Sequence, residues 1–344
     1  MSDTTAKRPY LKYGLLLAAL VLVLCLLIAA AVQQRHRILL QSAGDGSPNA
    51  LLPRSSASEQ NLAAGQSARW LDDYFLIITI DPQTLVIAEP RYDQQNLNYL
   101  IIGHDRAVLF DAGSGLRNVA AAAATLTDKP ITFVPSHLHY DHIGNGGPFA
   151  RTAMIDLPHL RARATTGEDN SEYVRPTWQE HLGAAEGYDA PNLRVDEWLI
   201  PGSVMSLGGR ALRVLYTPGH TNDSISLHDT ARGYLFSGDF MYQGPLYAFL
   251  PNSSLGGYQQ GAETLLANTA EDVKIFGAHR STPPGAPVLG RADIMAIQET
   301  LAQIAAGKLA SEGDYPVSYP VNDRMALLAE PQWLQNWEQL YPNL

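Results

Sequence analysis

Histidine and aspartate side chains gather in one short segment of this chain. Residues 136–145 read SHLHYDHIGN, which places within six positions His137, His139, Asp141 and His142. The chain holds only 10 histidines in 344 residues, so chance explains this cluster poorly. Imidazole and carboxylate groups bind zinc, and they also suit iron or manganese. The segment therefore predicts a metal site, against the simpler alternative of a polar surface loop.

The spacing within the segment predicts positions for two ions. His137 and His139 are two residues apart, so in extended backbone both point to one side and can bind one ion. Asp141 and His142 follow where the chain is expected to turn, and they can face a second ion. The remaining ligands must come from other parts of the chain.

Three later segments each end in a further candidate ligand. A predicted strand in ALRVLYTPGHT leads to His220, one in RGYLFSGDF leads to Asp239, and one in DVKIFGAHR leads to His279. If these strands belong to the sheets of one sandwich, their ends lie along one edge. Seven nitrogen and oxygen ligands would then converge on one point.

Short apolar runs separated by turn residues surround these ligands, which is typical of strands. The runs are YFLIITI (74–80), TLVIAEP (84–90), LNYLIIG (97–103), RAVLFDAG (106–113) and ITFVPSHLHYDH (131–142), and SISLHD (224–229) with RGYLFSGDF (232–240) predicts a hairpin. Helices are expected over 116–127, 254–269 and 290–310. The polar stretch 157–198 is predicted to be a loop-rich insertion with a little helix.

Some residues near the expected metal site are candidates for substrate contact. Residues 241–254, MYQGPLYAFLPNSS, include Tyr242, Tyr247 and Phe249. These rings could line an apolar substrate groove, although ordinary packing is an equal alternative. Arg280 could meet an acidic group of the substrate, and a surface ion pair is the simpler alternative.

These motifs together resemble those of the metallo-β-lactamase superfamily. HLHYDH fits its H-x-H-x-D-H signature, TPGHT, SGD and GAH match its downstream motifs in order, and VLFDAG with Asp111 matches its upstream motif. The resemblance covers roughly residues 70 to 310. It implies an α/β fold, the αββα metallo-β-lactamase sandwich, which agrees with the predicted order of strands and helices.

The resemblance also implies a role for each candidate residue. The first ion is expected to bind His137, His139 and His220, and the second to bind Asp141, His142 and His279. Asp239 resembles the carboxylate that bridges both ions, and Asp111 resembles a buried residue that steadies the ligand loop. Two Zn²⁺ ions per chain are expected, with iron or manganese as alternatives.

The chemistry implied by such a centre is hydrolysis. Metal coordination lowers the pKa of bound water from about 15.7 towards 7, which yields a hydroxide nucleophile. Asp141 is the candidate catalytic residue, because it could orient the hydroxide or pass its proton on. YLFSGDF is not a G-x-S-x-G elbow, so a serine hydrolase is not indicated.

One departure from the family pattern bears on the substrate. The commonest zinc β-lactamases carry a cysteine near the position of Asp239, but the only cysteine here is Cys25. An aspartate at this position resembles the pattern of glyoxalase II-like thioesterases, lactonases and phosphodiesterases. We therefore expect a zinc-dependent hydrolase that cleaves a thioester, lactone or ester of a small molecule. The alternatives are a β-lactamase-like amide hydrolase, an iron-dependent persulfide dioxygenase and a non-catalytic metal-binding protein on the same fold.

The N-terminus predicts a membrane anchor. Residues 14–32 form a run of nineteen without a charge, close to the ~20 that span a bilayer as a helix. Three basic residues precede the run and two follow it, which favours a cytoplasmic segment 1–13 and a periplasmic or extracellular main domain. A cleavable signal peptide is the alternative. We therefore predict a single-pass signal anchor in the inner (cell) membrane, a linker over 33–68 and the hydrolase domain over 69–344.

The composition and the predicted location limit the classes of partner and substrate that we expect. The formal net charge is −10, and the globular part has no run of Lys and Arg, which disfavours a nucleic-acid partner. An acyl-CoA substrate is hard to reconcile with a periplasmic domain, where a lactone, an ester or a β-lactam is easier to supply. The oligomeric state is not predicted.

Overall fold

The computed structural model describes residues 21–24, 62–181, 191–280 and 285–341. Contacts divide the chain into two units, Met1–Gly46 and Ser47–Leu344. In the first unit the described residues 21–24 are helical and exposed, and the rest of the predicted membrane span lies outside the described residues. Among the residues that are described, no helix has both the length and the apolar character needed to cross a bilayer.

The N-terminal half of the second unit forms a six-stranded sheet. Its strands lie in the order β1 (Ser67–Trp70), β2 (Leu76–Asp81), β3 (Thr84–Ala88), β4 (Leu97–Ile102), β5 (Ala107–Phe110) and β6 (Ile131–Val134). Neighbours pair antiparallel except β5 and β6, which are parallel and joined through α2 (Val119–Ala124). Parallel neighbours need such a crossover. Because β1 starts at Ser67, the folded unit includes residues that the sequence assigned to the linker.

A five-stranded sheet follows in the C-terminal half. It contains, in order, β12 (Val204–Ser206), β13 (Ala211–Tyr216), β14 (Ile225–Asp229), β15 (Tyr234–Gly238) and β17 (Lys274–Gly277). The predicted hairpin is present as the antiparallel pair β14–β15. β15 and β17 are parallel, and α5 (Leu255–Asn268) lies in the connection between them. The last long helix is α6 (Arg291–Ala305), close to its predicted range.

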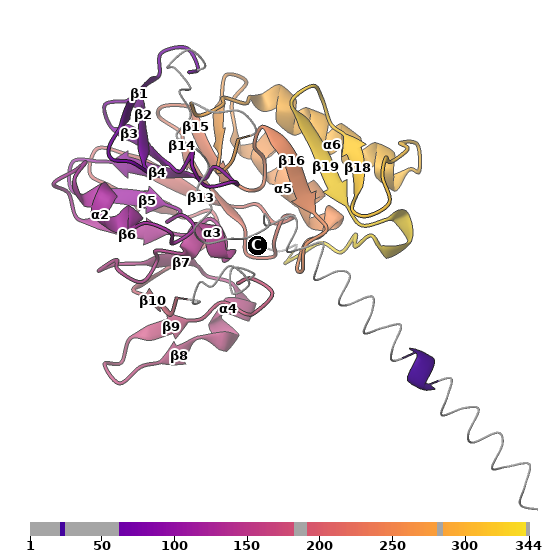
Figure 1. The fold of residues 1–344 in the computed structure, drawn as a ribbon, viewed down its shortest axis with the longest axis horizontal. Helices are drawn as coiled ribbons and strands as arrows, with labels where there is room; N and C mark the ends of the chain where they lie inside the picture. The colour runs from indigo at the N-terminus through magenta and orange to yellow at the C-terminus, as the bar shows by residue number, and fades with distance from the viewer. Residues whose placement is uncertain (1–20, 25–61, 182–190, 281–284, 342–344) are drawn as a thin grey trace, which may run out of the picture. The chain divides into compact units, whose positions relative to one another are not determined.

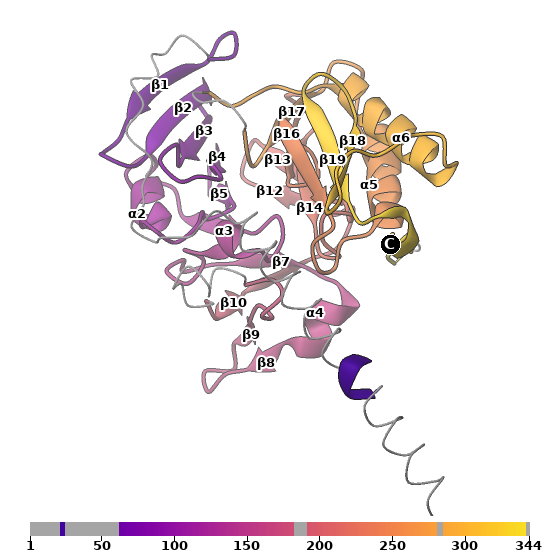
Figure 2. The ribbon, with the colours of Figure 1, turned by 45° about the vertical axis from the view of Figure 1, so that its right-hand side comes forward.

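Three apolar clusters show how these elements are layered. The largest lies between the two sheets, where the ring centroids of Tyr99 in β4 and Phe236 in β15 are 5.1 Å apart. A second cluster packs α5 and α6 on the outer side of the five-stranded sheet, and a third packs α2 on the outer side of the six-stranded sheet. The layers are therefore αββα, as predicted (Figures 1 and 2).

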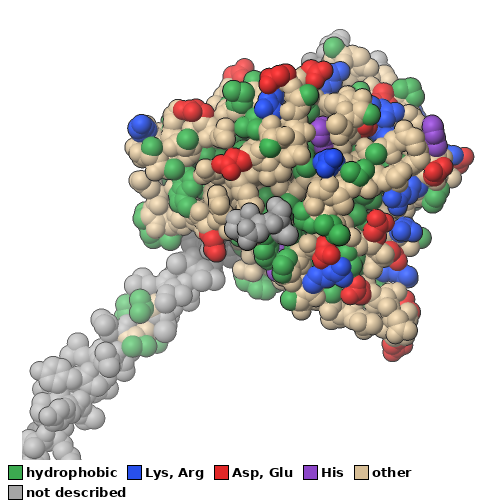
Figure 3. Space-filling view, turned by 180° about the vertical axis from the view of Figure 1, so that it is seen from behind, with side chains coloured by type: hydrophobic (Ala, Val, Ile, Leu, Met, Phe, Trp, Pro, Cys, Tyr) green, Lys and Arg blue, Asp and Glu red, His purple; other side chains and the backbone are tan. Residues whose placement is uncertain are grey.

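Smaller elements complete the unit. The ligand segment contains α3 (Tyr140–Ile143), and β7 (Ala153–Ile155) pairs with β11 (Glu197–Leu199). The predicted insertion holds α4 (Pro158–Arg163) and a sheet of β8 (Thr165–Thr166), β9 (Glu172–Val174) and β10 (Leu193–Val195). β16 (Gly244–Ala248) joins β19 (Met325–Ala329) and β18 (Val317–Pro320) in a third sheet, followed by the 3-10 helix Gln332–Leu334. On the face in Figure 3, acidic and basic side chains are interspersed.

Candidate metal centre

The histidine segment begins extended and then turns into a helix. His139 has φ −66° and ψ 148°, and α3 starts at the next residue. His137 and His139 therefore point to one side of an extended stretch, with ring centroids 4.6 Å apart. Asp141 and His142 lie in the first turn of α3. The local geometry is the one that the spacing predicted.

All seven predicted ligands meet in three overlapping groups of side chains. In each group the candidate ligand atoms lie within 4.8 Å of one another, and the groups are His137 with His139 and His220, His137 with His142 and Asp239, and Asp141 with His142 and His279. Every member is buried. The overlap means that the side chains form one centre with two half-sites.

The first half-site consists of three imidazoles. Nδ1 of His139 lies 3.0 Å from Nε2 of His137 and 2.9 Å from Nε2 of His220. Nδ1 of His137 contacts the Ser136 hydroxyl, and Nδ1 of His220 donates to the Tyr247 carbonyl oxygen at 2.8 Å. A carbonyl can only accept, so the proton of the neutral His220 ring is on Nδ1. Its Nε2 therefore presents a lone pair to the centre.

The second half-site combines two imidazoles with a carboxylate. Nδ1 of His142 donates to Oδ2 of Asp111 at 2.9 Å, and Nδ1 of His279 donates to the Gln94 carbonyl oxygen at 2.9 Å. The opposite nitrogens, Nε2 of both rings, lie 3.4 Å from Oδ2 of Asp141. The outer hydrogen bonds thus fix both rings with Nε2 facing the carboxylate.

Asp239 lies between the two half-sites. Its Oδ2 is 3.4 Å from Nε2 of His142 and 3.4 Å from Nε2 of His220, and its Oδ1 is 3.2 Å from Nε2 of His279. These rings belong to both halves of the centre. The carboxylate therefore lies within ion-pair distance of rings from both half-sites.

Close backbone approach brings this carboxylate to the histidine segment. Gly238, directly before Asp239, has φ +53°, a left-handed conformation that favours glycine. A Cβ at this position would lie 2.6 Å from Cβ of Ser136. A side chain at residue 238 would push the end of β15 away from the segment, so the SGD motif has a steric basis.

The first half-site is neutral. Burial, together with the neighbouring imidazoles, lowers the pKa of His137 well below its usual range and that of His139 to about 3. Burial also lowers the pKa of His220, although Asp239 opposes this. All three rings are therefore neutral near pH 7 and can offer lone pairs to a cation.

The second half-site brings buried carboxylates and imidazoles together, and each shifts the pKa of the other. Burial favours neutral forms, but Asp239, Asp141 and Asp111 outweigh it and hold the pKa of His142 well above its usual range. Conversely, His142 and His279 outweigh burial and keep the pKa of Asp141 below its usual range.

These observations test whether the residues fit a metal ion. Among the described residues, only histidine rings lie within ion-pair distance of Asp141 and Asp239. Nε2 of His142 and Oδ1 of Asp239 are buried without a hydrogen-bond partner. Buried charges need a counter-charge or a metal. A divalent cation with nitrogen and oxygen ligands fits this donor set, which contains no sulfur.

Asp111 stands behind the ligands, where the resemblance places it. Its side chain is buried, and its backbone has φ +69°. Oδ1 accepts a hydrogen bond from the Ser136 backbone N–H at 2.7 Å, while Oδ2 accepts from His142. One carboxylate therefore holds both the start of the ligand segment and a ring within it.

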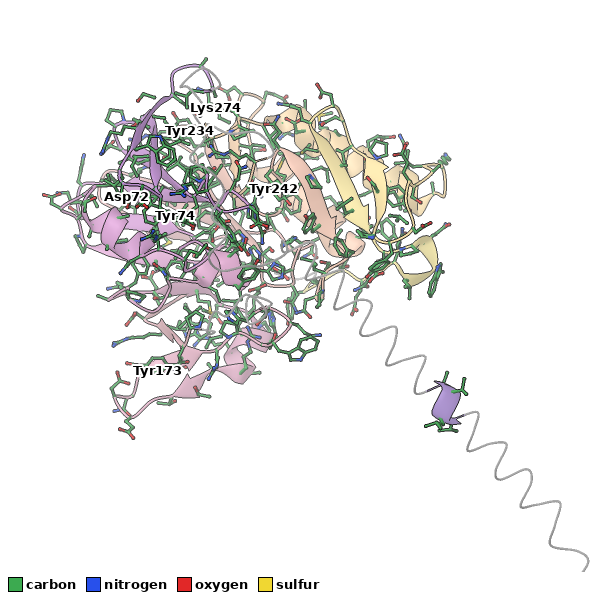
Figure 4. The ribbon with its side chains drawn as sticks, in the orientation of Figure 1. Asp72, Tyr74, Tyr173, Tyr234, Tyr242 and Lys274 are labelled. Carbon is green, nitrogen blue, oxygen red and sulfur yellow. The ribbon has the colours of Figure 1, made fainter. Side chains whose placement is uncertain are left out.

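The candidate substrate residues lie in different environments. Tyr242, which Figure 4 labels, has its ring 5.2 Å from the His279 ring. Its hydroxyl donates to the Pro245 carbonyl oxygen. Tyr247 is half-buried, and its carbonyl holds His220. Phe249 is only 1% exposed. The structure therefore brings both tyrosines beside the centre and places Phe249 in the core.

Arg280 is buried rather than exposed. Its guanidinium donates to Oε1 of Gln95 and to the Gly285 carbonyl oxygen. Within the described ranges no carboxylate pairs with it, and its Nη2 has no partner. Burial lowers its pKa to about 10. The alternative of a surface ion pair is therefore wrong.

Several residues beside the centre were not predicted from the sequence. Asn96 donates to Asp141, Gln94 donates from Nε2 to the Tyr140 hydroxyl at 2.6 Å, and the His181 ring lies against Tyr140. None of them belongs to a motif. The sequence signal that could have pointed to Gln94 and Asn96 is their place in residues 89–96, a loop directly before a buried strand.

Comparison with known proteins agrees with this centre. The sequence profile of the Metallo-beta-lactamase superfamily matches residues 91–300, and the chain belongs to this family. It is 35% identical over 189 residues to acyl-coenzyme A thioesterase MBLAC2 of Bos taurus, and 34% identical to the Homo sapiens protein. Each match covers 49% of this chain and 66% of the relative, just under two thirds of its length.

A solved structure agrees with the fold. A metallo-beta-lactamase family protein from Thermus thermophilus superposes with a TM-score of 0.50 and 19% identity, over 66% of this chain and 82% of that one. This similarity concerns the fold alone. The family assignment rests on the sequence profile, and all the ligand groups lie within the residues that it matches.

Proposed function

We propose that this enzyme hydrolyses a thioester of a small acyl compound and holds two divalent metal ions, with zinc as the first candidate. The observation that carries the thioester assignment is the 35% identity to an acyl-coenzyme A thioesterase. The two bridged half-sites support the hydrolytic chemistry. Lactones and other esters remain the next candidates, because they present a similar carbonyl to the same residues.

The metal would be held by the residues described above. The first ion is proposed to bind His137, His139 and His220, the second to bind Asp141, His142 and His279, and both to share Asp239. Bound there, the ions would supply Lewis acidity and a nucleophilic water at neutral pH. The same nitrogen and oxygen set also suits iron or manganese.

Asp141 is proposed as the catalytic carboxylate. His142 and His279 keep its pKa below the usual range, so it is ionised at neutral pH. Its Oδ2 faces the second half-site and can accept a hydrogen bond from the attacking water, which orients that water.

The tyrosines and Arg280 are proposed to act on the substrate side. Tyr247 is half-buried, and burial together with the nearby Asp239 carboxylate raises the pKa of its hydroxyl, so the side chain lies close enough to the centre to contact the acyl group. Tyr242 shields the His279 ring, and its hydroxyl is already bonded to a carbonyl. Arg280 is the weaker candidate, because its bonds lead to Gln95 and Gly285 rather than to the centre.

Two rival activities can be compared with the site. A β-lactamase-like amide hydrolase would use the same ligands and differ in the surrounding loops. An iron-dependent persulfide dioxygenase needs one metal, and the complete second half-site favours a two-metal hydrolase over it.

A hydrolysis panel tests the proposal. Zinc-loaded full-length chain is assayed with an acyl thioester, a lactone, a chromogenic cephalosporin and a persulfide, with the His137→Ala variant as the blank. Thioester turnover that is absent from the blank is the expected result. Turnover of another substrate class with none on the thioester would replace the assignment.

Membrane anchoring is a separate proposal that rests on the sequence. The uncharged run 14–32 and its basic flanks support a single-pass anchor, with a linker before the hydrolase domain. A fusion of alkaline phosphatase after residue 68 should be active if the domain is exported. A fusion that is made in full but inactive would overturn the periplasmic assignment and favour a compartment that supplies acyl-CoA.

A further inference from the structure

The loop between β3 and β4 supplies no metal ligand, yet it touches the second half-site twice. The Gln94 carbonyl oxygen accepts the Nδ1 hydrogen bond of His279 at 2.9 Å. Two residues later, Nδ2 of Asn96 donates to the Asp141 carbonyl oxygen at 2.7 Å and lies 3.2 Å from Asp141 Oδ2. Two of the three side chains in the second half-site, those of Asp141 and His279, are therefore held by one short segment.

The orientation of the Asn96 amide is fixed by its surroundings. Both Asp141 atoms that it contacts are oxygens that accept, so the NH₂ group must face them. The carboxylate oxygen involved, Oδ2, is also the atom that lies 3.4 Å from the Nε2 atoms of His142 and His279. The Asn96 amide thus orients Oδ2 of Asp141 toward the His142 and His279 rings.

The loop itself is firmly held. Its ends are joined by a backbone hydrogen bond from Glu89 to the Asn96 carbonyl oxygen at 2.9 Å, and Leu97 donates to Ala278, the residue before His279, at 2.7 Å. Gln95 adopts φ +52° and accepts a hydrogen bond from buried Arg280. A left-handed non-glycine residue costs free energy and persists only where its surroundings enforce it.

By contrast, this segment does not touch the first half-site in the described hydrogen bonds. His137 and His220 are held by Ser136 and the Tyr247 carbonyl. A perturbation of Asn96 should therefore act on one ion and spare the other.

We infer that Asn96 is a positioning residue for the second metal ion, because it orients Asp141 while the adjoining Gln94 carbonyl orients His279. This inference rests on the proposed two-ion function. Loss of an outer-shell partner typically weakens metal affinity by about 10- to 100-fold. The Asn96→Ala and Asn96→Asp variants should show that loss for the second ion alone. The aspartate variant keeps the volume but replaces the donor with a second carboxylate.

Asn98 provides a matched control two residues further along. It is as buried as Asn96, and its Nδ2 also donates to a backbone carbonyl and a carboxylate, those of Ile87 and Glu89. The side-chain oxygens of both asparagines are buried and have no partner. The Asn98→Ala variant should therefore lose comparable thermal stability but keep the second ion.

The experiment measures metal binding rather than turnover. Full-length apo-protein is titrated with Co²⁺ and followed by visible absorption, and zinc per chain is measured after dialysis against buffered zinc. We expect two ions for wild type and for Asn98→Ala, and one tight ion plus a weakened second for both Asn96 variants. Equal second-ion affinity in wild type and Asn96→Ala, or equal loss in Asn96→Ala and Asn98→Ala, would overturn the positioning role. Wild-type protein that binds one ion only would contradict the two-ion function itself.

Discussion

The Asp111→Asn substitution tests whether the outer hydrogen bonds set the metal affinity. Asp111 accepts from the Ser136 backbone N–H at 2.7 Å and from Nδ1 of His142 at 2.9 Å, one bond on each carboxylate oxygen. Asparagine has the same shape but only one acceptor oxygen. One of the two N–H groups must then face the amide NH₂. If the oxygen stays with Ser136, the His142 ring loses the acceptor that keeps its proton on Nδ1.

The expected loss of metal affinity follows from the loss of one hydrogen bond. A hydrogen bond to a charged group contributes about 1.5–3 kcal/mol. At about 1.4 kcal/mol per factor of ten, the lost bond corresponds to about 10- to 100-fold weaker binding of the ion that His142 would hold. This agrees with the general cost of removing an outer-shell partner. The first half-site should keep its affinity, because the rings of His139 and His220 do not contact Asp111 in the described hydrogen bonds.

Metal titration and kinetics together give the test. The second-ion dissociation constant and kcat/KM for an acyl thioester are measured for wild type, Asp111→Asn and Asp156→Asn. Asp156 pairs at 2.7 Å with half-exposed Arg161, so its variant controls for the loss of one surface charge and should change neither value by more than about twofold. Asp111→Asn with second-ion affinity within twofold of wild type would refute the reasoning.

Three further substitutions or treatments have defined outcomes. Asp239→Ala should bind fewer than two metals per chain and lose turnover, and elemental analysis that still finds two would show that the carboxylate does not bridge. Burial and the nearby charge of Glu180 raise the pKa of Asp223 to about 7, above the ~3.9 of an exposed aspartate. The folded chain therefore binds this proton more tightly than the unfolded chain does, and the resulting stabilisation is lost as the pH rises from about 4 to 7. The melting temperature of Asp223→Asn relative to wild type should then increase between pH 5 and 8, and a constant difference would contradict this. Chelation should lower the melting temperature, and added zinc should restore it, because a metal that binds only the folded state stabilises it.

The sandwich could be predicted because its signals are local. Strands β2 to β6 and the β14–β15 hairpin each lie in a short apolar run bounded by turn residues. Each predicted ligand follows such a run, so the ends of the strands located the centre before any contact was known. The H-x-H-x-D-H spacing predicted which side chains of that segment share a face, whereas the assignment of each ligand to an ion followed from the resemblance.

The third sheet, formed by β16, β19 and β18, was missed because its pairing is not local. β16 joins β19 as a parallel partner, and Gly244 lies opposite Met325 across a large sequence separation. Each strand has only five residues, GPLYA and MALLA, and neither contains a β-branched residue. The same applies to the insertion, whose strands β8 to β10 have two or three residues each.

The supports of the ligands divide into those that a sequence can reveal and those that it cannot. Asp111 acts through its side-chain carboxylate at a motif position, so its role can be predicted from the residue type. Gln94 and Tyr247 act through backbone carbonyls, which every residue possesses. Asn96 lies 45 residues from Asp141, and only the folded loop brings its amide there. Side-chain substitution of Gln94 would leave the His279 bond in place, so the carbonyl must be tested through the loop that holds it. The Asn96 side chain reaches a predicted ligand directly, which makes Asn96 an informative position for mutation.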